Sequence, residues 1–318
     1  MPTTQHCSPF EPTLEAGIAA LVNEFVAQKA EGVPLPSIAQ RREGYEASVA
    51  LAGESPQSVT FEERAIGHIR LRIYRRDQRS NQPMAVYFHG GCFVSGSFTT
   101  HHQQLATLAQ LSDAIVVAVS YRMAPEFLYP AAHNDAFDAT QWIYENAHVL
   151  GGDASNITLI GDSAGGHLAL ATCLRLKQQA EWLPKQQILI YPMLDPFGCS
   201  ESYQTFGDDY VITRQMLLSG FELYASGKFH LPELNLLQRG DLAGLPVTHI
   251  LTAECDPLRD EGEKLYALLT KQGVEAHCQR YLGVIHGFFQ LAGVSQAARQ
   301  SLRHVALLIK STEQRDFS

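Results

Sequence analysis

The pentapeptide Gly161–Gly165 carries a serine, Ser163, in the pattern G-x-S-x-G. The strand-like run Asn156–Ile160 precedes it, and a helix-forming stretch rich in leucine and alanine follows it. In such a strand-turn-helix the serine stands in a strained turn, exposed for nucleophilic attack, and the first amide groups of the helix face the developing oxyanion. A structural Gly-Ser turn is the alternative, because the chain holds 24 glycines. The setting favours Ser163 as a nucleophile.

A second glycine-containing segment, His89–Phe93, directly follows the apolar run Met84–Phe88. Glycine has no side chain to obstruct a substrate, so the backbone N–H groups of Gly90 and Gly91 can approach a substrate oxygen. Together with the N–H of Ala164 they would form an oxyanion hole. A phosphate-binding loop is the competing interpretation, but neither the Walker nor the dinucleotide spacing is present. We expect the histidine of this segment to anchor the loop rather than to act as a base.

The base must come late in the chain if the order is serine, acid, histidine. Two histidines meet this condition, His286 and His304. His304 lies in the amphipathic stretch Ser295–Ile309, where a surface or interface position is expected. His286 lies in a loop after the strand-like run Ala276–Leu282, where its side chain can point into a site. We therefore expect His286 to accept the serine proton.

Three carboxylates compete for the role of the acid that orients the histidine. Asp256 comes directly after the strand-like run Val247–Leu251, which is where such an acid is needed. Asp195 follows the preceding strand, a position that some hydrolases use. Asp260 begins the next helical stretch and would more simply cap it. The order of elements favours Asp256.

The elements that must position these residues alternate between short apolar runs and helical stretches. The expected buried strands are Met84–Phe88, Ile115–Val119, Ile157–Ile160, Ile188–Tyr191 and Val247–Leu251. The expected helices between them are His102–Leu111, Ala132–Asn146, Ala164–Gln178 and Glu261–Gln272. Continuous apolar strands joined by helical crossovers indicate an α/β fold, with a mostly parallel central sheet flanked by helices. In such sheets the site lies at the carboxyl ends of the strands.

Two further segments are expected to lie over the site. Residues 1–50 hold two N-terminal helices, one at Leu14–Ala30 and one that Ser37 could cap. The connection between the strands near Tyr191 and Val247 is longer than a crossover needs. We interpret residues 196–236 as an inserted helical cap, although a surface excursion with its own small core is the alternative. Residues 51–195 and 237–318 would then form the catalytic domain.

Composition excludes several classes of function. A formal charge of −9 and the lack of a basic stripe argue against nucleic acid as a partner. We interpret the short arginine cluster, Arg70, Arg72, Arg75 and Arg76, as a solvated strand edge. The segment Met1–Phe10 lacks the pattern of a signal peptide, and no run is apolar enough for membrane insertion. Six scattered cysteines form no CxxC pair, which argues against a zinc site and indicates reduced thiols in a cytoplasmic protein.

Taken together, these motifs resemble the hormone-sensitive-lipase family, bacterial family IV, of α/β-hydrolase esterases. Its signatures occur in order: His89–Phe93 for HGGGF, Tyr121–Glu126 for YRLAPE, Gly161–Gly165 for GDSAG, Asp256–Gly262 for DPLRDEG and His286–Phe288 for HGF. The resemblance spans about residues 74–309 and implies a cap, hydrolysis of small-molecule carboxylic esters and no cofactor or metal. It also favours Asp256 as the acid, and a homodimer is compatible with it.

The chain departs from this family at Cys92, where a third glycine is usual. That position supplies an oxyanion N–H in the family, and the contact is expected to survive if φ of Cys92 stays negative. No cation is evident in the sequence to lower the pKa of the thiol.

The function that follows is a serine carboxylesterase for short-chain acyl esters. A peptidase or amidase remains an alternative, because a triad alone does not separate esters from amides. A non-catalytic ligand receptor of the same fold is the other alternative, but such receptors lack the histidine that is present here as His286.

Overall fold

The computed structural model describes residues 12–29 and 35–310. The segment Met1–Phe10, for which no signal peptide was expected, lies outside the described residues, as do Cys7 and Pro34. No helix within the described ranges is both long enough and apolar enough to cross a membrane.

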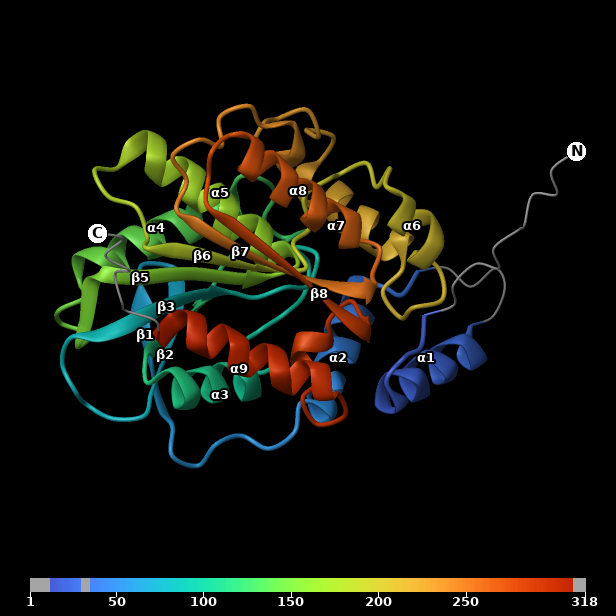
Figure 1. The fold of residues 1–318 in the computed structure, drawn as a ribbon, viewed down its shortest axis with the longest axis horizontal. Helices are drawn as coiled ribbons and strands as arrows, with labels where there is room; N and C mark the ends of the chain where they lie inside the picture. The colour runs from blue at the N-terminus through green and yellow to red at the C-terminus, as the bar shows by residue number, and fades with distance from the viewer. Residues whose placement is uncertain (1–11, 30–34, 311–318) are drawn as a thin grey trace, which may run out of the picture.

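An eight-stranded sheet forms the centre of the molecule, in the order β1-β2-β4-β3-β5-β6-β7-β8 (Figure 1). The strands are β1 (Thr60–Ile66), β2 (Ile69–Arg75), β3 (Gln82–Phe88), β4 (Ile115–Ser120), β5 (Gly152–Asp162), β6 (Gln186–Ile190), β7 (Val247–Cys255) and β8 (Ala276–Ile285). The pairs β1–β2 and β2–β4 are antiparallel, and all other pairs are parallel. The expected α/β-hydrolase architecture is therefore confirmed, with every predicted strand present.

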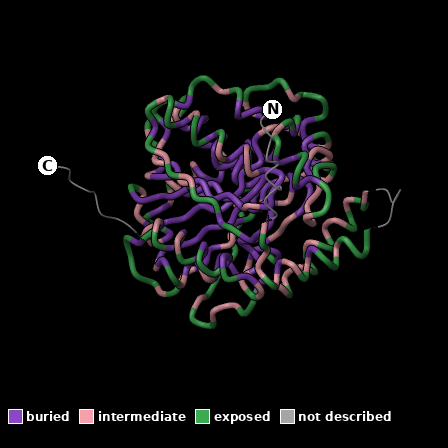
Figure 2. The backbone as a smooth tube through the Cα atoms, turned by 45° about the vertical axis from the view of Figure 1, so that its right-hand side comes forward, coloured by how far each residue is buried: buried purple, intermediate pink, exposed green. Residues whose placement is uncertain are grey.

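Helices cover both faces of this sheet (Figure 1). One face carries α4 (Ala131–Glu145), α5 (Ala164–Gln179) and α8 (Arg259–Lys271), and the other carries α3 (His102–Ser112) and α9 (Gln296–Lys310). The apolar core is split accordingly into two clusters, one on each side of the sheet. Figure 2 shows the central strands as buried, which explains why their sequences are continuous apolar runs rather than alternating ones.

The arginine cluster was wrongly assigned to a strand edge. Arg70, Arg72 and Arg75 lie on β2, which is paired on both sides by β1 and β4. Their guanidinium groups form ion pairs with Glu62 and Glu63 of β1. The neighbouring strand β1 therefore neutralises the arginine charges, and the sequence of β2 by itself does not indicate this pairing.

The N-terminal helices and the insertion lie toward the carboxyl ends of the parallel strands (Figure 1). The N-terminal part forms α1 (Ala16–Gln28), α2 (Ile38–Ala47) and a short 3-10 turn, η1 (Ser48–Leu51). As predicted, Ser37 caps α2, in a capping box with Gln40. The insertion forms α6 (Glu201–Phe206) and α7 (Arg214–Ala225) and is followed by η2 (Leu236–Gln238). The division into cap and catalytic domain stays a prediction.

Candidate active site

Ser163 occupies the sharp turn between β5 and α5. Its backbone has φ 54° and ψ −118°, a strained conformation for a residue with a side chain, at a cost of about 1–3 kcal/mol. Its N–H donates to the carbonyl of Ile190 at 2.8 Å, and its own carbonyl accepts from Met193 N at 3.1 Å. The neighbouring strand end therefore holds the turn from both sides.

The glycines that flank this turn permit its close packing. A Cβ on Gly165 would lie 1.9 Å from the carbonyl oxygen of Phe88, and one on Gly161 would lie 2.1 Å from that of Gly165. Such contacts are impossible for real atoms, so α5 could not approach β3 and β5 with any larger residue. The sequence-based expectation for the elbow agrees with this geometry.

Three residues from separate strand ends form one hydrogen-bonded chain. His286 Nε2 lies 3.1 Å from Ser163 Oγ, and His286 Nδ1 lies 2.9 Å from Asp256 Oδ2. Asp256 is fully buried, and its second oxygen accepts from Leu258 N at 2.7 Å. With the imidazole proton on Nδ1 donated to Asp256, Nε2 is left to accept the serine proton. This arrangement can activate a hydroxyl nucleophile.

The other candidates lie elsewhere. Asp195 accepts from Phe197 N at 3.0 Å and so closes a local turn at the start of the insertion. Asp260 does not cap its own helix, because α8 begins at Arg259; its carboxylate instead accepts from Ser202 N, at the start of α6. His304, on α9, is hydrogen-bonded to the hydroxyl of Tyr281.

The segment His89–Phe93 lies beside Ser163, but Gly90 has a different role from the one expected. The N–H of Gly90 donates to Asp162 Oδ1 at 2.9 Å, so it does not face a substrate oxygen. Among the described residues, the N–H groups of Gly91, Cys92 and Ala164 have no hydrogen-bond partner. Of the four oxyanion donors expected from the sequence, these three are not engaged by another group of the described residues.

Cys92 differs from expectation in two respects. Its φ is +55°, and Phe93 follows with +63°, so the condition of a negative φ, on which the expected oxyanion contact of Cys92 rested, is not met. The Cys92 backbone packs closely against Gly220 of α7, where an added Cβ would lie 2.5 Å from Cys92 O. The structure also places a cation near the thiol, Arg41 of α2. Burial outweighs that cation and raises the pKa of Cys92.

His89 has the anchoring role that was expected of it. Its imidazole stacks on the ring of Tyr121 at a centroid distance of 4.3 Å, and the Tyr121 hydroxyl donates to its carbonyl at 2.6 Å. Burial lowers the pKa of His89 to about 4, so the ring is neutral at physiological pH.

A buried carboxylate that sequence reasoning missed joins the parts of the site. Asp162 accepts hydrogen bonds from the Tyr87 hydroxyl at 2.8 Å and from Gln290 Nε2 at 3.0 Å, and lies 3.1 Å from His101 Nε2. Burial acts to raise its pKa, but the interactions with His101 and the hydrogen bond from Tyr87 together outweigh burial and lower it. The only signal for Asp162 in the sequence was its place beside Ser163, which does not reveal its distant partners.

Within the described ranges, no group of three or more histidine, cysteine, aspartate or glutamate side chains is placed to hold a metal ion.

Known proteins resemble the chain over most of its length. A family model described as the alpha/beta hydrolase fold matches residues 85–290. An ethyl acetate hydrolase of Pseudomonas putida is 31% identical over 307 residues, which cover 91% of this chain and 96% of that protein. A carboxylesterase of Mycobacterium tuberculosis is 36% identical over 76% of this chain and 80% of its own length.

Solved structures give the same result. A hyperthermophilic esterase of Pyrobaculum calidifontis is 36% identical and superposes with a TM-score of 0.87, covering 94% of this chain and 98% of that one. A thermostable esterase of Pseudomonas putida is 28% identical with a TM-score of 0.89, covering 95% and 98%.

Proposed function

The chain belongs to the α/β-hydrolase family, among the esterases that resemble hormone-sensitive lipase, and we propose that it hydrolyses short-chain carboxylic esters through an acyl-enzyme on Ser163. The observation that carries this proposal is the continuous chain from Ser163 Oγ through His286 to Asp256, at 3.1 and 2.9 Å. Related proteins named as esterases support the ester as the substrate class.

In the first step, Ser163 Oγ attacks the ester carbonyl while His286 Nε2 takes its proton. Asp256 holds the imidazole in the required tautomer and stabilises the imidazolium that forms. His286 then gives the proton to the leaving alcohol. In the second step, His286 takes a proton from a water molecule as it attacks the acyl-enzyme, and returns that proton to Ser163 Oγ as the bond to the acyl group breaks and the acid is released.

The negative charge on the carbonyl oxygen is stabilised by backbone donors. We assign this role to the N–H groups of Gly91, Cys92 and Ala164, and assign Gly90 to the support of the loop. Ala164 is the first residue of α5, so the helix dipole adds to the stabilisation. Such donors act strongly because the site is buried, with Ser163 only 3% exposed.

Replacement of the nucleophile tests the proposal. Ser163→Ala removes the attacking oxygen, so covalent labelling by a fluorophosphonate should be abolished. Hydrolysis of a nitrophenyl acetate should fall by about 10⁶-fold in kcat, to the rate left by the oxyanion donors and binding. Circular dichroism of the variant controls for folding. Labelling or normal turnover in a folded Ser163→Ala protein would contradict the assignment.

A homodimer and a cytoplasmic location stay predictions from the sequence.

A further inference from the structure

The loop that bears two of the proposed oxyanion donors has a conformation that needs support from outside. Gly91, Cys92 and Phe93 have consecutive positive φ angles of 120°, 55° and 63°. Only glycine adopts this region without strain, so Cys92 and Phe93 persist in it only where neighbouring groups hold them. The loop closes on itself through Val94 N, which donates to the carbonyl of Gly91 at 3.0 Å. A group that fixes Val94 therefore also fixes Gly91.

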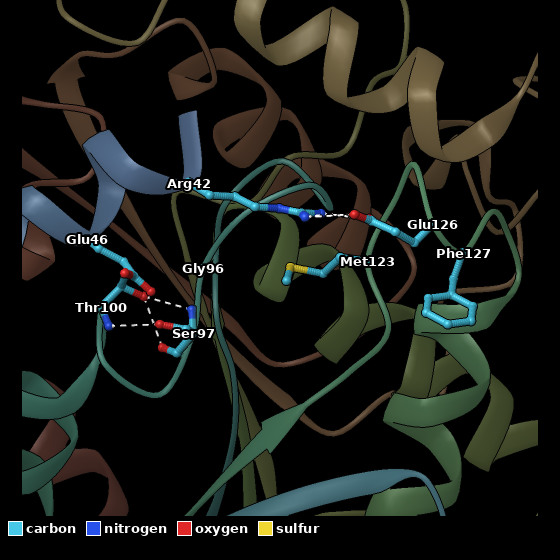
Figure 3. Close-up of a pocket in the computed structure, with 8 residues that line it drawn as sticks. All are labelled: Arg42, Glu46, Gly96, Ser97, Thr100, Met123, Glu126 and Phe127. Atoms are coloured by element: carbon cyan, nitrogen blue, oxygen red, sulfur yellow. Dashed lines mark hydrogen bonds and ion pairs between the residues drawn. The ribbon is translucent and has the colours of Figure 1, made fainter. Parts of the chain in front are cut away.

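Arg42, on the N-terminal helix α2, supplies such a group (Figure 3). Its Nε donates to the carbonyl of Val94 at 2.8 Å. Its Nη2 donates to the carbonyl of Ala124 at 3.1 Å, and Ala124 N in turn donates to the carbonyl of Phe93 at 2.9 Å. One guanidinium thus holds the loop directly at Val94 and indirectly at Phe93.

Glu126 fixes the guanidinium itself. Its two carboxylate oxygens accept from Arg42 Nη1 at 2.8 Å and Nη2 at 2.7 Å, a bidentate pair that sets the plane of the fork. The hydrogen bond from Arg42 lowers the pKa of Glu126 to about 2, so both groups are charged at neutral pH. A lysine ammonium cannot reproduce this set of contacts, because it is a point charge without a planar fork.

We propose that Arg42 is a positioning residue for ester hydrolysis, holding the loop that carries Gly91 and Cys92 in the conformation that binds the oxyanion. The inference rests on the proposed function and adds a role for α2 in the chemical step. Arg42 itself touches no reacting atom. Its removal should weaken binding of the transition state, in which the oxygen is charged, more than binding of the neutral ester.

The first test is a split between kcat and KM. Arg42→Ala should lower kcat for a nitrophenyl acetate by about 10- to 100-fold, below the loss for a whole oxyanion donor, and leave KM within about 3-fold. The rate of fluorophosphonate labelling should fall by a similar factor, because the phosphonyl adduct uses the same donors. Arg42→Lys should lower kcat by about as much as Arg42→Ala. It replaces the alanine variant in this comparison of kcat and KM if the alanine variant does not fold.

Glu126→Gln is the matched control. It removes the charge pair but leaves the Arg42 contacts to Val94 and Ala124, so its loss of kcat should be several-fold smaller. If Glu126→Gln lowers kcat more than Arg42→Ala does, Glu126 acts other than through Arg42 and the proposal is overturned.

Chemical rescue separates positioning from general stability. A cavity of about 350 Å³ borders Arg42 and is also lined by Gly96, Met123 and Phe127, so the space left by Arg42→Ala is continuous with it (Figure 3). Ethylguanidine at millimolar concentration should enter and raise kcat of Arg42→Ala at least 3-fold, whereas ethylammonium should not. A thermal unfolding curve measured with each additive controls for stabilisation of the whole protein.

Two outcomes oppose the inference. A kcat in Arg42→Ala equal to that of the parent protein, or a rise in KM alone, overturns the positioning role. The proposed function stands in either case as long as the parent protein hydrolyses the ester and is labelled at Ser163. Failure of the parent protein in both assays overturns the proposed function instead.

Discussion

At the residue scale, the three candidate carboxylates are distinguished by their partners. Asp256 is fully buried and accepts from the imidazole, whereas Asp195 and Asp260 accept from backbone N–H groups of the insertion. Asp256→Asn keeps the shape but presents an amide to Nδ1, which favours the wrong tautomer of His286. We expect kcat to fall by about 10⁴-fold in steady-state ester hydrolysis.

The two rejected carboxylates are controls of the same chemical change. Asp195→Asn and Asp260→Asn should each lower kcat far less than Asp256→Asn does. Asp260→Asn should instead lower the thermal stability, because it weakens the cap on the first turn of α6. A larger loss of kcat in Asp195→Asn than in Asp256→Asn would refute the assignment of the acid.

Cys92 gives a second prediction at this scale. Cys92→Gly retains the backbone N–H and relieves a positive φ of 55°, so most esterase activity should remain. Because the thiol is 7% exposed and burial raises its pKa, bulky thiol reagents should inactivate the parent protein slowly, by steric block. Substrate should protect against this inactivation, and Cys92→Gly should remove it.

The control for this experiment is the exposed thiol of Cys199, in the insertion. Inactivation that persists unchanged in Cys92→Gly would assign the sensitive thiol elsewhere, with Cys199 the first candidate. Cys255 is a poorer one, because burial raises the pKa of its thiol to about 12.

At the scale of elements, the insertion packs directly on the loop that bears Cys92. Tyr224 of α7 stacks on Phe93 with ring centroids 4.5 Å apart, and Gly220 lets the helix backbone approach Cys92. At the other end, Ser202 of α6 donates its hydroxyl to the carbonyl of Pro257, next to Asp256. The insertion therefore contacts both the oxyanion loop and the acid loop.

This packing predicts a limit on acyl length. Because α7 packs on the loop beside Ser163 through Tyr224 and Gly220, we expect higher kcat/KM for acetyl to hexanoyl nitrophenyl esters than for longer ones. Activity should not rise when substrate passes from monomers to an emulsion. The measurement is a series of acyl lengths at constant leaving group, with amide analogues as controls. Faster turnover of long-chain triglycerides than of short esters would argue against a closed site.

At the scale of the whole molecule, sequence predicts what is encoded locally. The buried strands are recognisable because the central parallel strands are apolar on both faces, and the Ser163 and His286 motifs are contiguous peptides at strand ends. The hydrogen bond from Gln290 to Asp162 joins residues 128 positions apart, and the one from Arg42 to Val94 joins residues 52 positions apart. No local sequence pattern indicates such contacts. The packing of α7 on Cys92 through Gly220 is equally distant in sequence, so no local pattern indicates it either.

Buried titratable groups also determine how the stability of the whole molecule depends on pH. His89, His133 and His167 are buried, and burial lowers their pKa values, to about 4 for His89 and His167. Glu261 is buried as well, and burial raises its pKa to about 8. In the unfolded chain these groups return to ordinary values, near 6.5 for histidine and 4.5 for glutamate. The three histidines therefore bind protons more readily in the unfolded chain, and Glu261 binds a proton more readily in the folded chain.

The free energy of unfolding should be greatest near pH 6.5. Between pH 4.5 and 6.5 the unfolded chain holds extra protons at the three histidines, whereas the folded chain holds one extra proton at Glu261. Because the histidines are more numerous, the free energy of unfolding falls as the pH is lowered. Between pH 6.5 and 8 Glu261 alone of these four groups differs, and because the folded state holds the extra proton, stability falls as pH rises. Urea unfolding midpoints measured from pH 5 to 8 test both the acid and the alkaline loss of stability.

The control variant is Glu261→Gln, which keeps an oxygen that can accept from Leu194 and Asp195 N–H. It should abolish the alkaline loss of stability and leave the acid loss in place. A decline that persists unchanged in this variant would locate the titrating group elsewhere.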